Sequence, residues 1–90
     1  MTTTEQRYQD RGDSAAREDI DEGNTCPVED IDDGMVLQHL GLDDGGAEAR
    51  GILRDAAERA ERDGYPDDGA EMLEAARAGA LRGYRAAMEA

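Results

Sequence analysis

The chain has 90 residues and a formal net charge of −13, because ten basic residues, all arginine, stand against 23 carboxylates. This length allows one small domain and excludes multidomain enzymes, barrels and dinucleotide-binding folds. Leu, Ile, Val and Phe together number only 11, which is typical of disordered or marginally folded chains when the net charge is large. The 15 alanines favour helix instead.

Residues 1–34 are expected to form an acidic flexible tail. They hold 11 acids and three arginines, with few large apolar side chains. Two short helices are conceivable, Glu5 to Arg11 and Ala15 to Glu22, with Gly12 ending the first and Gly23 the second. Neither shows an apolar stripe, and isolated helices this short are marginal in water. We therefore expect the tail to be disordered, or wrapped on a partner.

Residues 35–90 are predicted to form a small helical unit. A first helix is expected at about 33–40, capped by Asp32 or Asp33. Gly41 then suits the left-handed position after a helix, and Leu42 can fold back onto it.

A second helix is expected at about 45–63, capped by Asp43 or Asp44 and ended by Gly64. Its apolar residues recur at helical spacing and form one face. They are Ala49, Ile52, Leu53, Ala56 and Ala60.

A third helix is expected at about 68–90, after the turn Tyr65-Pro66-Asp67. Asp68 followed by Glu71 resembles a capping box. Its apolar stripe comprises Leu73, Ala76, Ala80, Tyr84 and Ala87. The short loop predicts that this helix is antiparallel to the second, with Leu53 and Ala56 facing Leu73, Ala76 and Ala80.

The fold class predicted is therefore all-α, a helical hairpin or three-helix unit with an acidic N-terminal tail. Gly79 and Gly83 weaken the last helix but permit close approach of another helix. Since few large side chains are available for a core, we expect this helix to gain stability from packing in a homo- or hetero-oligomer.

The sequence predicts no enzyme, no cofactor and no metal site. Cys26 is the only cysteine, so an internal disulfide or a cysteine-based metal site is excluded and a reducing cytoplasm is the expected location. His39 is the only histidine and has no evident catalytic partner. No apolar run reaches membrane-spanning length and no secretory signal is recognised. The net charge opposes binding to nucleic acid and to anionic membranes.

One block of acids predicts a partner-binding segment. Seven carboxylates fall within 15 residues with no arginine in the block: Asp19, Asp21, Glu22, Glu29, Asp30, Asp32 and Asp33. An apolar helix follows directly, and Met35, Leu37 and Leu40 could anchor a partner protein that the charges attract. This pattern indicates a binding protein for a larger, basic protein partner, as an inhibitor, charge mimic or adaptor.

Two alternatives remain open from the sequence. The chain could be a small accessory or structural subunit of a multi-subunit enzyme, in which the tail wraps a larger chain. The acidity could also reflect a GC-rich genome or a salt-rich cytoplasm, since net charge alone proves no function.

Overall fold

The computed structural model describes residues 3–25, 27–64 and 66–89, and it is all-helical. In chain order the elements are α1 (Thr4–Asp21), the 3-10 turn η1 (Val28–Asp30), α2 (Asp33–His39), α3 (Ala47–Asp63) and α4 (Gly69–Glu89). No strand occurs in these described ranges. The predicted fold class is confirmed, whereas Cys26 and Tyr65 lie outside the described residues.

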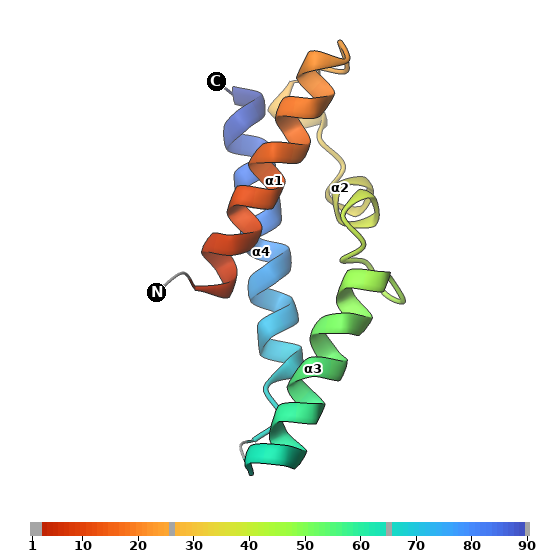
Figure 1. Cartoon of the computed structure of the whole chain (residues 1–90). Coiled ribbons are helices and arrows are strands. Elements are labelled where there is room, and N and C mark those ends of the chain that lie inside the picture. Colours follow the sequence, from red (N-terminus) through yellow and green to blue (C-terminus); the bar gives the residue numbers. More distant parts are fainter. Residues whose placement is uncertain (1–2, 26, 65, 90) are drawn as a thin grey trace.

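The long helix α4 is the centre of an elongated molecule with extents of 46 × 28 × 20 Å. Figure 1 shows α1 running parallel to α4 beside its C-terminal half, while α3 runs antiparallel beside its N-terminal half. The short helix α2 lies on the α3 side, next to the upper part of α4. Every other helix therefore packs on α4.

The predicted α3–α4 hairpin is confirmed, with one change in the residues that face inward. Ala56 and Ala76 are buried between the helices as expected. Leu53, however, remains 42% exposed and lies beside Gly69 at the start of α4. Neighbouring helical residues point about 100° apart, so Ile52 takes the core position and Leu53 cannot.

The caps agree in part with those expected. The carboxylate of Asp32 accepts a hydrogen bond from the backbone N–H of Gly34 at 2.9 Å and so caps α2. Gly41 has a φ of 73°, and Leu42 folds back into the core with no exposed surface. The expected Asp43 or Asp44 cap of α3 is wrong, because Gly46 occupies that position. A side chain there would overlap the carbonyl of Gly41, so the tight turn selects glycine.

The expectation of a disordered N-terminal tail is not confirmed, because residues Thr4–Asp21 form α1, a single helix of 18 residues. Thr3 caps it by accepting a hydrogen bond from the N–H of Gln6 at 3.1 Å. Gly12 does not end the helix but lies buried in its middle. The face that α1 buries consists of Tyr8, Gly12, Ala15 and Ala16, a stripe at helical spacing that is made mostly of small residues.

Glycines on both helices allow the backbones of α1 and α4 to come unusually close. A Cβ at Gly12 would overlap the backbone of Ala80, and one at Gly83 would overlap the carbonyl of Gln9. At the margins of this contact, Arg82 pairs with Glu5 at 2.5 Å. α1 thus occupies the close-approach surface of α4 for which the sequence predicts a helix partner.

A small core joins the four helices. Its buried members are Tyr8, Leu42, Ala49, Ile52, Leu73, Ala76 and Ala80, with Leu37, Leu40 and Met72 packed against them. The hydroxyl of Tyr8 donates a hydrogen bond to Glu48, whose carboxylate also pairs with Arg11 at 2.7 Å. Burial, followed by this bond to Glu48, raises the pKa of Tyr8 to about 12.

Arg77 fastens the α2–α3 connection to α4. Its guanidinium donates to the carbonyl oxygen of Leu42 at 2.7 Å and pairs with Asp44 at 3.2 Å. This hydrogen bond satisfies the buried carbonyl of Leu42, which would destabilise the fold if it had no partner.

Candidate functional site

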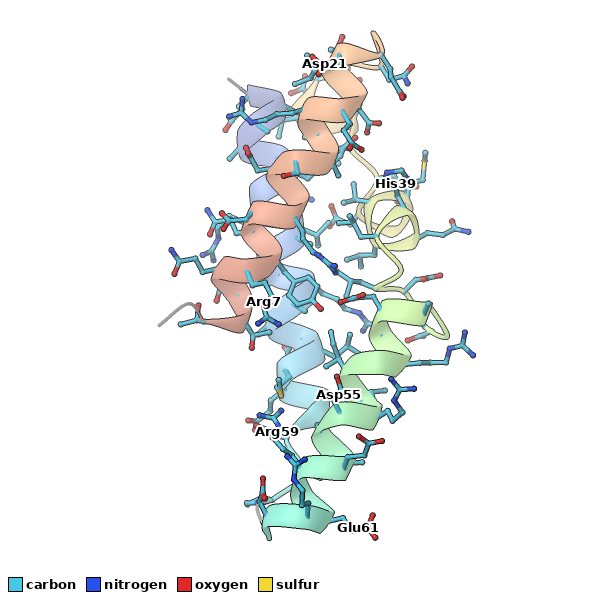
Figure 2. The ribbon with its side chains drawn as sticks, viewed as in Figure 1. Arg7, Asp21, His39, Asp55, Arg59 and Glu61 are labelled. Atoms are coloured by element: carbon cyan, nitrogen blue, oxygen red, sulfur yellow. The ribbon has the colours of Figure 1, made fainter. Side chains whose placement is uncertain are left out.

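An open pocket of about 510 Å³ lies where the C-terminal half of α1, the connection through η1, α2 and α4 meet. We call it the acidic pocket. It is lined by Asp19, Asn24, Thr25, Asp30, Ile31, Asp32, Met35, Val36, His39 and Tyr84. In Figure 2, Asp21 marks the end of α1 and His39 marks α2, the two helices between which the pocket opens.

The pocket brings together four of the ten residues that the sequence predicts for partner binding. Asp19 comes from α1, Asp30 from η1, Asp32 from the α2 cap and Met35 from α2. Three further members of the acidic block, Asp21, Glu22 and Glu29, are exposed on the neighbouring segments but do not line the pocket.

Three carboxylates of the acidic block have partners within the chain. Asp33 pairs with Arg85 of α4. Asp19 accepts a hydrogen bond from the hydroxyl of Tyr84 at 2.5 Å, and Asp32 caps α2. Within the described ranges, Asp33 is the only one of the seven acids of the block in an ion pair. The block therefore keeps most of its charge uncompensated, although it is not wholly unpaired as the sequence suggests.

The apolar residues of α2 divide between the core and the surface. Leu37 and Leu40 are partly buried and pack against the core, so they stabilise the fold. Met35 lies on another face of the helix and is 68% exposed. With 3.6 residues per helical turn, Met35 points in a different direction from Leu37 and Leu40. A run of apolar residues in the sequence does not by itself show this difference.

The pocket also contains residues to which sequence reasoning assigns no partner-binding role, among them Ile31, His39 and Tyr84. Tyr84 is separated from its partner Asp19 by 65 positions, so no local motif could connect them. Ile31 could have been found from its place as an isolated apolar residue between acids.

The electrostatic character of the acidic pocket differs from that of other hollows on the surface. Its lining includes three carboxylates and no arginine. Each of four other surface hollows contains at least one arginine. In a pocket without a fixed cation, the carboxylates attract cations from outside the chain.

The described side chains offer no group of three or more His, Cys, Asp or Glu that could hold a metal ion. In the same part of the chain, no helix is long and apolar enough to cross a membrane. Comparison with protein-family models, with curated proteins and with solved structures finds no match. Function is therefore inferred from the chemistry of the chain itself.

Proposed function

We propose that this protein is a non-enzymatic binding protein that uses its acidic segment and the adjoining helix α2 to engage the basic surface of a larger protein partner, as an inhibitor, charge mimic or adaptor. The observation that carries the proposal is the acidic pocket, which is lined by three carboxylates and apolar side chains and has no arginine of its own. We expect the binding to take place in the cytoplasm.

Uncompensated charge supports a basic partner. Asp21, Glu22, Glu29 and Asp30 are exposed and form no ion pair among the described residues. Charges arranged in this way speed the encounter with a positive surface and make association sensitive to salt. They repel phosphate backbones, which favours a protein over a nucleic acid as the partner.

Met35 supports a contact that is more than electrostatic. Its side chain is 68% exposed beside the carboxylates that line the pocket. A flexible, polarizable thioether adapts to the shape of a partner surface. Apolar contact of this kind supplies affinity, whereas the exposed charges chiefly set encounter rate and orientation.

The test replaces the exposed acids that have no role in the fold. The variant Asp21→Asn, Glu22→Gln, Glu29→Gln, Asp30→Asn removes four charges and leaves the Asp32 cap and the Asp33–Arg85 pair intact. A matched control removes four charges from exposed acids on α3 and α4: Glu58→Gln, Glu61→Gln, Glu74→Gln, Glu89→Gln. Each protein is used as bait. Retained proteins are eluted between about 50 and 500 mM salt and then identified by mass spectrometry.

We expect a basic protein that wild type and control retain and the variant loses. Its affinity for wild type should fall at least about five-fold across that salt range. A partner bound equally by variant and control would refute the proposal. Retention of an enzyme complex that salt does not release would instead favour an accessory subunit.

A further inference from the structure

We infer that the acidic pocket receives an arginine side chain from an extended segment of the protein partner, with an apolar residue next to that arginine. This inference rests on the proposed function and names the group that the partner inserts. It follows from the mixed chemistry of the pocket lining, from the rings it contains and from its size.

The lining combines apolar and anionic side chains. Ile31, Val36 and Met35 supply aliphatic and thioether surface, and carboxylates from α1, η1 and the α2 cap supply negative charge. Long cationic side chains match this combination, because they lay their aliphatic stems on apolar surface and keep the charged head beside polar groups. A purely apolar residue would bring no positive charge to the carboxylates.

The rings and carboxylates favour arginine over lysine. His39 and Tyr84 both line the pocket. A guanidinium is planar, stacks on aromatic faces and binds carboxylates through two parallel hydrogen bonds, whereas an ammonium is a strongly hydrated point charge. Asp19 already accepts one hydrogen bond from Tyr84. Its carboxylate has sites for about four such bonds, so it retains capacity for a guanidinium.

The size of the pocket favours a chain segment over a free cation. Its volume of about 510 Å³ exceeds that of one arginine side chain, so that side chain alone would leave part of the pocket empty. The exposed Met35 adds to the apolar surface of Ile31 and Val36. An apolar neighbour of the arginine would fill that remainder.

The first experiment titrates the ¹⁵N-labelled full chain with capped hexapeptides of sequence Gly-Ser-Arg-Leu-Gly-Ser. Two further peptides carry lysine or the uncharged analogue citrulline in place of arginine. We expect the arginine peptide to move the amide signals of Thr25, Ile31 and Val36. Its affinity should exceed that of the lysine peptide about three-fold and that of the citrulline peptide about ten-fold.

The second experiment uses neighbouring acids as a matched pair. Glu29 and Asp30 carry the same charge in the same 3-10 turn and are both exposed, but only Asp30 lines the pocket. Asp30→Asn should weaken binding of the arginine peptide about three-fold or more, whereas Glu29→Gln should change it by less than half as much. Ile31→Ala should weaken it as well, by removing apolar wall.

Three results would overturn the inference: equal affinity for arginine and citrulline peptides, equal weakening by the two acid variants, or equal affinity for the peptide and for arginine amide alone. The last would assign the pocket to a small cation. If a captured partner still distinguishes the four-acid variant from its control in such a case, the proposed function stands without this pocket occupant. If the partner does not distinguish them, both proposals fail.

Discussion

Alanine at Gly83 should destabilise the protein even though alanine is the better helix former. Gly83 lies in α4, where a Cβ would overlap the carbonyl oxygen of Gln9 and lie 3.0 Å from the backbone nitrogen of Asp13. These are backbone atoms of α1, so they can yield only if the whole helix moves. The substitution therefore separates α1 from α4 along their contact.

The magnitude follows from two opposing terms. Replacing a helical glycine by alanine stabilises a helix by about 1 kcal/mol. Overpacking a tight contact costs about 1–3 kcal/mol, and here the strain also draws Arg82 from Glu5. These two terms leave a net loss of up to about 2 kcal/mol. Because the overlapping atoms belong to the backbone, we expect Gly83→Ala to fall in the upper half of that range and to lower the free energy of unfolding by about 1–2 kcal/mol.

Gly51 provides the matched control. It lies inside α3, and a Cβ at this position would meet nothing within 4 Å. Gly51→Ala should therefore raise the free energy of unfolding by up to about 1 kcal/mol. Since 1 kcal/mol shifts the melting temperature of a domain of this size by about 4–8 °C, the two variants should differ by about 10 °C or more.

Urea unfolding followed by circular dichroism at about 222 nm measures the helix lost in each variant. Amide hydrogen exchange in α1 reports local separation, which should increase in Gly83→Ala while exchange in the middle of α3 stays unchanged. If Gly83→Ala proves as stable as Gly51→Ala, the close packing of α1 on α4 is refuted.

Three other substitutions test polar contacts, each by urea unfolding. Tyr8→Phe removes the bond to Glu48 and should cost about 1 kcal/mol. The pKa of Tyr8 is raised to about 12 in the folded protein, compared with about 10 in the unfolded chain. The stabilisation that the protonated hydroxyl provides is therefore complete below about pH 10 and is lost as the pH rises towards 12. In Tyr8→Phe, stability should decline less steeply over this pH range. Arg77→Ala leaves the carbonyl of Leu42 unpaired and should cost about 1.5 kcal/mol. Arg17→Ala should leave the urea midpoint unchanged, because the ion pair between Arg17 and Asp13 lies on the exposed surface of α1 and such pairs contribute little to stability.

The parts of the fold that sequence could predict are those fixed by neighbours along the chain. Asp32, Gly41 and Gly64 mark helix ends through their own backbone and side-chain chemistry. The α3–α4 hairpin follows from its short loop. These features require no knowledge of distant residues.

The helix α1 could not be predicted in the same way, because Tyr8 is the one large side chain on its buried face and the rest of that face is glycine and alanine. Gly12 contributes by allowing α1 to approach the backbone of Ala80, and Gly79 and Gly83 of α4 admit the backbone of α1 in the same way, so the contribution exists only once the two helices are packed together. Hydrophobic periodicity gives such positions little weight. Tyr84 is missing from the predicted site for the same reason, because its contact with Asp19 depends on how α1 packs on α4.

The parallel packing of the first and last helices has a consequence for biosynthesis. α1 leaves the ribosome before α4 has been made, and contacts such as Asp19 with Tyr84 join residues 65 positions apart. At synthesis rates of about 5–20 residues per second, α1 waits a few seconds for its partner. A nascent helix with a large apolar face would be prone to aggregate during that wait. The small-residue face of α1, which is flanked by acids, exposes little apolar surface that could associate with other chains. It still packs tightly on α4 once that helix has been made.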